Sequence, residues 1–247
     1  MHAIAFCGVL ITGLALMLPA AKAGVTVTIN QQQYQFSGNP RLTEVLAPVA
    51  LQQSWYWPAA ALYQLNEPAP EQMRHDVLQQ LASLQTAYAD DNAMLTTLVA
   101  IARQVQSWQL AKRVMRNIDY DAASIDPARN PRFDNGNYLL RLTPRPKQLY
   151  LFGALSNAGG ITHQSATELA GYRSAINYLA AAAQHQIFLL QPDGNQQQAG
   201  VASWNHVHVE PMPGSQLFVP IAAPLFDQQI TALNQDLLAL AVHRVLP

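Results

Sequence analysis

Cysteine is nearly absent from this chain. The single Cys7 among 247 residues lies in an apolar amino-terminal stretch that runs from Ile4 to Leu18. Pro19 follows, and then Ala21-Lys22-Ala23, which has the small-x-small form of a signal-peptidase site. Cleavage after Ala23 leaves a mature chain that can form no disulfide and no thiolate. The mature fold therefore has to be stable without covalent cross-links.

Long apolar runs are also scarce. The run from Ile4 to Leu18 is shorter than the roughly 20 residues that span a bilayer, and no later segment is long and apolar enough to cross one as a plain helix. We therefore predict that residues 1–23 are a signal peptide, that the mature protein is periplasmic and that it has no transmembrane span. A retained membrane anchor is the alternative.

Charged residues make up only 12% of the chain, against 50% hydrophobic residues. Loss of Lys22 from the 14 basic side chains leaves 13 against 15 acidic ones, a difference of −2. Nucleic-acid binding depends on the neutralisation of phosphates by basic side chains. The balance of charge therefore gives no electrostatic basis for a nucleic-acid partner.

The motifs of phosphate-binding loops are missing too. Gly159-Gly160 precedes Ile161-Thr162 rather than Lys-Ser/Thr, and Gly153 and Gly159 lack the spacing of a Gly-x-Gly-x-x-Gly turn. We interpret LYLFGALSNAGG, residues 149–160, as a strand that bends at a glycine and returns through a Gly-Gly turn. No bound nucleotide or other cofactor is expected.

What the sequence does contain is a β-rich unit interrupted by helices. Alternating residues predict a β-hairpin at 25–36 and strands at 113–118 and 138–142, while a short helix at 40–49 has Asn39 as its expected cap. Two apolar stripes between 70 and 109, separated by residues 89–92, predict an antiparallel helical hairpin. The loop at 126–137 is rich in Pro, Asn and Gly.

A second unit follows the two prolines of Thr143-Pro144-Arg145-Pro146, which restrict the chain to an extended linker. It repeats the plan of the first unit. The predicted strands lie at 149–152, 161–162, 187–190, 200–204 and 217–219, the helix at 167–181 and a turn at 192–194. This order is typical of a β-grasp, or ubiquitin-like, domain.

The last segment, residues 227–245, has the pattern of an amphipathic helix. One face carries Ile230, Leu233, Leu237, Leu240 and Ala241. Such a helix could lie on a membrane, form a pore with copies of itself or pack on its own domain. Because Arg244 is the only basic residue of the polar face, the membrane alternative is disfavoured, and we predict packing on the body of the protein.

Several stretches together resemble the group 4 capsule biosynthesis proteins of the GfcC type. They are VTVTI at 25–29, the cluster Trp55-Tyr56-Trp57-Pro58, the stretch 149–160, Trp204-Asn205 and, most specifically, VEPMPGSQL at 209–217. The resemblance covers essentially all of the mature chain.

This resemblance implies an α+β fold of two tandem β-grasp domains, arranged as in Wza-type outer-membrane polysaccharide exporters. The first domain would span 24–145 with a helical hairpin insert near 68–110, and the second 146–223. The amphipathic helix in 224–247 would pack on the second domain. The implied role is in capsule or exopolysaccharide assembly and export in the periplasm of a Gram-negative bacterium, as a monomer that binds polysaccharide, the outer-membrane export machinery, or both.

The resemblance also points to Arg113, which lies where the family has a centrally placed arginine, although Lys112 stands where a glycine is expected. A guanidinium can pair with a carboxylate or stack on an aromatic ring, and both contacts suit acidic sugars. A structural clamp between the two domains is the alternative role for Arg113.

The aromatic residues Trp55, Tyr56 and Trp57 are a second candidate for binding, because sugar rings stack on aromatic faces. The same three side chains could instead be wedged between the domains. They are therefore candidate binding residues together with Arg113.

The pattern His206-Val207-His208-Val209-Glu210 would place two imidazoles and a carboxylate on one face of a strand. Those three side chains are a weak candidate for a metal site, since no fourth ligand can be assigned. For the acidic loop that contains Asp119, Asp121 and Asp126, the context favours turns and caps.

That loop contains Asp119, Asp121 and Asp126, which could supply the paired carboxylates of a glycoside hydrolase. The preferred hypothesis is nevertheless a non-enzymatic accessory protein of polysaccharide export, and a periplasmic polysaccharide-modifying enzyme that uses the acidic loop is the alternative. In the alternative, changing these aspartates to asparagine abolishes turnover without loss of stability.

The predicted cleavage can be checked by mass spectrometry of the protein purified from a periplasmic fraction. The chain is expected to begin at Gly24. A chain that keeps residues 1–23 and sediments with membranes would instead support the anchor.

Overall fold

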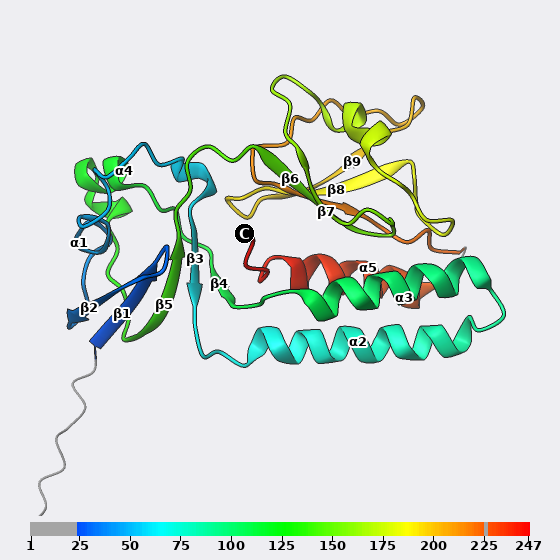
Figure 1. Cartoon of the computed structure of the whole chain (residues 1–247), viewed down its shortest axis with the longest axis horizontal. Helices are drawn as coiled ribbons and strands as arrows, with labels where there is room; N and C mark the ends of the chain where they lie inside the picture. The colour runs from blue at the N-terminus through cyan, green and yellow to red at the C-terminus, as the bar shows by residue number, and fades with distance from the viewer. Residues whose placement is uncertain (1–23, 225–226) are drawn as a thin grey trace, which may run out of the picture.

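The computed structural model describes residues 24–224 and 227–247 (Figure 1). The predicted signal peptide lies outside the described residues. None of the helices within the described ranges combines the length and apolar character needed to cross a bilayer.

Two five-stranded mixed sheets form the framework, and they share one strand order. In the first sheet, β1 (Gly24–Ile29) pairs in parallel with β5 (Gly136–Arg141), and β2 (Gln32–Ser37), β3 (Ala61–Gln64) and β4 (Lys112–Val114) complete the order β2-β1-β5-β3-β4. The second sheet repeats it as β7-β6-β10-β8-β9, with β6 parallel to β10. Its strands are β6 (Gln148–Gly153), β7 (Gly159–Thr162), β8 (Gln186–Leu190), β9 (Gln196–Gly200) and β10 (Gln216–Val219). The predicted repetition of one plan and the α+β class are confirmed.

The helical hairpin is formed by α2 (Ala69–Ala87) and α3 (Asn92–Ser107). Asp91 begins the second helix as its N-cap, because its side chain accepts a hydrogen bond from the Met94 N–H at 3.0 Å. Both helices were predicted from their apolar stripes, and most residues of both stripes are buried. The hairpin prediction is therefore confirmed.

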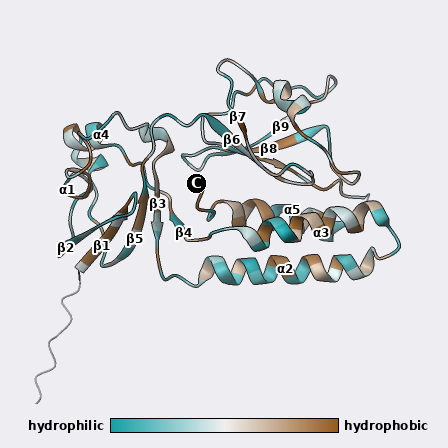
Figure 2. Cartoon of the chain, viewed as in Figure 1, coloured by the Kyte–Doolittle hydropathy of each residue, from teal (hydrophilic) through white to brown (hydrophobic). Residues whose placement is uncertain are grey.

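The hairpin leaves the first sheet and packs with α5 (Gln228–Ala241) beneath the second sheet (Figure 1). Val77 and Leu81 of α2, Leu98 of α3 and Leu237 of α5 share one core with the strands of the second sheet. Figure 2 shows apolar residues in these helices and in the strands that they cover. The predicted packing of the terminal helix on the protein body is confirmed, and its N-cap is Asp227.

The first sheet has a core of its own, separate from the core of the second sheet. Val25 and Val27 of β1 pack there against Leu42 and Leu46 of α1 (Leu42–Leu46) and Phe133. The helix is shorter than predicted. Its N-cap is Arg41, and the expected cap Asn39 instead donates a hydrogen bond to the Phe133 carbonyl at 2.8 Å.

The prediction of a helix over 167–181 is wrong. Only a short 3-10 helix, Leu169–Ala175, forms in that segment. The Leu169 N–H donates to the Val209 carbonyl at 2.8 Å and the Leu179 N–H to the Ala154 carbonyl at 3.1 Å. The amides at both ends thus bond to neighbouring segments, and this pairing replaces the bonds that would continue a helix.

Three other segments differ from the prediction. The return strand was predicted at 200–204, but β9 already ends at Gly200. It begins earlier because a tight turn directly precedes it, closed by a hydrogen bond of 2.8 Å from the Gln191 N–H to the Asn195 carbonyl. Residues 206–210 form no strand. The chain after β4 turns into α4 (Tyr120–Ile125), a helix that the sequence did not predict.

In the glycine-rich stretch 149–160 the chain bends at Gly153, which ends β6 with φ of +104°. The predicted Gly-Gly turn is wrong, because Gly159 and Gly160 already begin β7. A Cβ at this position would lie 2.2 Å from the Val219 carbonyl oxygen and 2.7 Å from the Phe218 ring. The Gln104 side chain of α3 also bonds to both the N–H and the carbonyl of Gly153, each at 2.9 Å. The glycine thus serves close packing within the second core.

The carboxyl end of α5 meets the exit of the hairpin. The Ala111 N–H donates to the His243 carbonyl at 3.0 Å, and the Val245 N–H donates to the Gln109 carbonyl at 2.8 Å. The Arg113 N–H donates to His243 Nδ1 at 3.0 Å. This junction joins the edge of the first sheet to the helix that covers the second.

We expect Gly153→Ala to lower the free energy of unfolding by more than about 2 kcal/mol, because it combines a positive φ with a backbone clash. Gly159→Ala is the matched control, since its φ is +138° but its Cβ would meet nothing within 4 Å. Urea unfolding of both variants checks this. Equal losses would contradict the role given to close packing.

His243 predicts a pH dependence of stability. Burial, reinforced by the nearby Lys112, lowers the pKa of His243 below its usual 6.5, and its Nδ1 accepts a proton only by losing the bond from Arg113. The unfolded chain therefore takes up this proton more readily, and stability falls as pH drops below about 6.5 toward the lower folded pKa.

In His243→Asn the amide oxygen can still accept the Arg113 N–H but cannot titrate. We expect a weaker loss of unfolding free energy between pH 7 and about pH 5 than in the wild type. His75→Asn, at an exposed position of α2, should keep the wild-type slope. An unchanged slope in His243→Asn would contradict the prediction.

Candidate functional site

A pocket of about 450 Å³ lies between the two sheets, at the junction just described. Its walls come from β3 to β5, the linker, β6, the turn between β8 and β9, β10 and the end of α5. The lining residues are Ala59, Ala61, Tyr63, Arg113, Met115, Arg141, Thr143–Gln148, Tyr150, Leu190–Pro192, Gly194, Gly214, Gln216, Val242, Arg244, Leu246 and Pro247.

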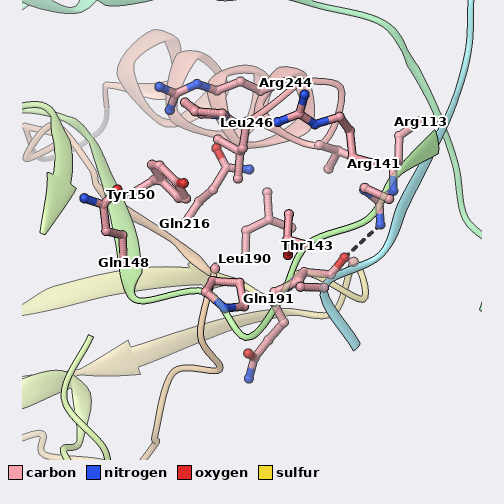
Figure 3. Close-up of a pocket in the computed structure, with 18 of the residues that line it drawn as sticks. Arg113, Arg141, Thr143, Gln148, Tyr150, Leu190, Gln191, Gln216, Arg244 and Leu246 are labelled. Carbon is pink, nitrogen blue, oxygen red and sulfur yellow. Dashed lines mark hydrogen bonds between the residues drawn. The ribbon is translucent and has the colours of Figure 1, made fainter. Parts of the chain in front are cut away.

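The charged side chains that line the pocket are all positive. Arg113, Arg141, Arg145, Lys147 and Arg244 line it, and none of its described lining residues is Asp or Glu. Figure 3 shows three of these guanidinium groups around the same space as Tyr150 and Gln216. Like charges concentrated in a concave site raise the local concentration of a ligand of opposite charge, so the pocket favours an anion.

Arg113 is held by groups from both units. Its Nη2 donates to the Pro192 carbonyl of the second unit at 2.8 Å, the bond dashed in Figure 3. Its guanidinium also lies over the Tyr63 ring, 5.2 Å from the centroid, and its Nη1 donates to the Tyr63 hydroxyl at 3.4 Å. The clamp predicted as the alternative role is therefore present, and the same side chain lines the pocket.

Arg244 follows α5 and packs over the buried Trp108, 5.1 Å from the ring centroid. Burial lowers the pKa of its guanidinium, which still keeps its charge at neutral pH. Burial also raises the pKa of the Tyr150 hydroxyl, although the neighbouring Arg244 and Arg141 lower it. Tyr150 is therefore a neutral phenol beside two cations.

Unpaired buried polar atoms concentrate at this pocket. Among the described residues, six buried side-chain nitrogen or oxygen atoms have no hydrogen-bond partner, and four of them belong to lining residues. These four are Arg113 Nε, Thr143 Oγ1, Gln216 Oε1 and Arg244 Nη1. Such atoms are rare in folded proteins because each costs free energy, so their grouping makes the pocket the candidate ligand site.

The aromatic cluster does not form an open surface on which sugar rings could stack. Trp55, Tyr56 and Trp57 are half-buried; Trp55 Nε1 donates to the Val49 carbonyl at 2.9 Å, and Trp57 Nε1 donates to Asp121 at 3.3 Å. Tyr56 alone approaches the pocket, with its ring 5.1 Å from the guanidinium carbon of Arg145.

The histidines of 206–210 lie on a loop and not on the predicted strand. Glu168 Oε2 lies between them, 3.0 Å from His206 Nε2 and 2.8 Å from His208 Nδ1, while Glu210 is 3.7 Å from His208. Within the described residues, no group of three or more His, Cys, Asp or Glu side chains is arranged to hold a metal ion.

Two of the three aspartates of the acidic loop cap helices. Asp119 accepts from the Ala122 N–H at 3.0 Å at the start of α4, and Asp126 accepts from the Ala128 N–H at 2.9 Å. Asp121 accepts from Trp57. The sequence-based expectation that turns and caps use these residues agrees with these contacts.

Most residues of the pocket could not be assigned to a site from the sequence. Arg141, Tyr150 and Arg244 were predicted only as strand or helix residues, and Gln216 only as part of the motif at 209–217. The concentration of cations near the Pro-rich linker, at Arg141, Arg145 and Lys147, offered a further signal. Their convergence depends on how the two sheets and α5 meet.

Comparison with known proteins agrees with this architecture. Residues 21–145 match the model of the capsule biosynthesis GfcC N-terminal family, and residues 157–246 match that of the capsule biosynthesis GfcC C-terminal family. The uncharacterized protein YjbG of Escherichia coli (strain K12) is 32% identical over 211 residues, which cover 85% of this chain and 84% of YjbG. The chain therefore belongs to the GfcC family of capsule biosynthesis proteins.

Proposed function

We propose that this protein is a periplasmic accessory protein of capsule or exopolysaccharide assembly and export, and that it binds a short segment of the polysaccharide in the pocket between its sheets. Membership of the capsule biosynthesis family supports a role in capsule assembly. The observation that carries the binding proposal is the pocket itself, which presents five cationic side chains and no Asp or Glu side chain among its described lining residues.

Binding is favoured over catalysis by the distribution of carboxylates. Glycoside hydrolysis requires two carboxyl groups that face each other across the scissile bond. No Asp or Glu is found among the described residues that line the pocket, and Asp119 and Asp126 cap short helices outside it. The matching family is not a known family of enzymes.

The proposal includes the view that each unit is a β-grasp domain. In both sheets the chain opens with a hairpin, and the last strand of the sheet in chain order lies parallel to the first strand of that hairpin. Two such domains in tandem form the walls of the pocket. Because the family suggests involvement with polysaccharide export, the export machinery is the expected protein partner.

The proposal can be tested with exopolysaccharide fragments from the source bacterium and the purified mature chain. Arg113→Ala should weaken binding by at least about tenfold, because a hydrogen bond to a charged group contributes about 1.5–3 kcal/mol. Arg103→Ala is the matched control, since Arg103 is exposed on α3 and does not line the pocket.

Arg113 also clamps the two units, so thermal melting has to show that the variant is folded. Arg145→Ala is a second variant that removes a pocket cation without breaking the Pro192 contact. The proposal would be refuted if the wild type failed to bind, or if folded variants at both positions bound as tightly as it does.

A further inference from the structure

We infer that the pocket between the sheets recognises an acidic sugar residue, with its carboxylate at the guanidinium groups of Arg113 and Arg244 and a hydroxyl at Gln216. The inference rests on the proposed function and names the chemical class of the segment bound there. It comes from the donors and acceptors that the fold leaves unpaired.

The unpaired donors call for an anion. Arg113 uses its two terminal nitrogens on Tyr63, Ala60 and Pro192, but its Nε has no partner. For Arg244, no side-chain hydrogen bond is found to any other described residue, and its buried Nη1 is unpaired. A buried N–H of a charged group without an acceptor carries a full desolvation penalty. A carboxylate suits guanidinium groups because their N–H groups match its two oxygens.

The unpaired acceptor calls for more than an anion. Gln216 is nine-tenths or more buried on β10, and its Nε2 donates to the Ala241 carbonyl of α5 at 3.0 Å. With Nε2 used on Ala241, the Oε1 of the same amide is left as an acceptor without a donor. Sulfate cannot donate a hydrogen bond to it, whereas a sugar hydroxyl can.

Thr143 adds a second group for hydroxyls. Its Oγ1 can donate or accept, and it is the fourth unpaired atom at the pocket. Figure 3 shows Thr143, Gln216, Arg113 and Arg244 around the same space. A ligand that enters and turns these side chains toward itself supplies acceptors to the arginines and donors to Gln216 and Thr143. Hydroxyl and carboxylate groups on one small ring meet both needs.

The volume of the pocket agrees with a single short segment. About 450 Å³ lies in the lower part of the range of small-molecule sites. The ring of Tyr150 lines the same space and offers an apolar surface beside the cations. An acidic sugar within a chain therefore fits better than a long stretch of neutral polymer.

The test compares methyl β-D-glucuronide with methyl β-D-glucoside, which differ only in a carboxylate against a hydroxymethyl group. In NMR titrations of the mature chain we expect the glucuronide to bind at least tenfold more tightly. Sodium sulfate should bind more weakly than the glucuronide. Equal affinity for the two glycosides would overturn the carboxylate assignment, and equal affinity for sulfate and glucuronide would overturn the hydroxyl assignment.

Gln216→Met removes the unpaired acceptor while keeping a similar side-chain volume. It should weaken glucuronide binding several-fold and leave sulfate binding unchanged. This change also removes the bond to Ala241 and could destabilise the fold. If Gln216→Met melts at a lower temperature than the wild type, Thr143→Val tests the hydroxyl assignment in its place. Wild-type glucuronide binding in folded forms of these variants would overturn the assignment.

Exopolysaccharide fragments separate this inference from the proposed function. Fragments are compared before and after chemical reduction of their carboxyl groups to alcohols. Binding that is lost on reduction supports both proposals. Binding that survives unchanged leaves the proposed function standing and overturns the acidic-sugar inference, and absence of binding to either preparation overturns both.

Discussion

The pairing of residues 109–113 with 243–245 is the constraint on which the rest of the structure depends. Its bonds from Ala111 to the His243 carbonyl and from Val245 to the Gln109 carbonyl tie the exit of the helical hairpin to the end of α5. The hairpin belongs to the first unit by chain order but buries its apolar face with α5 under the second sheet. Separating the units would therefore expose part of the second core, which holds the pocket walls in place.

This junction also concentrates positive side chains, with no Asp or Glu among the described residues that line the pocket. Each of three arginines rests on an aromatic ring: Arg113 on Tyr63, Arg145 on Tyr56 and Arg244 on Trp108. Stacking stabilises a guanidinium without consuming its in-plane N–H groups. The arginines can therefore be supported by the fold and still have donors left for a ligand.

The patterns that determine local structure were sufficient for much of the fold. The stripes of α2, α3 and α5 and the alternation in β1, β5 and β6 are strong periodic signals. They failed between 167 and 181, where the apolar spacing fits a helix and Leu169, Tyr172 and Ile176 are buried, yet the terminal amides bond to other segments. They failed again at 206–210, where alternating residues lie on a loop.

For the candidate site, the sequence by itself determined the family, the two repeated units and the candidacy of Arg113, because these depend on motifs and on periodicity along the chain. It could not determine that Arg113 would meet Arg141, Arg244, Tyr150 and Gln216, which are separated from it by up to 131 positions. Only the tertiary structure brings these residues together, because their positions depend on which core the hairpin and α5 join. Unpaired donors and acceptors exist only once that packing has excluded water.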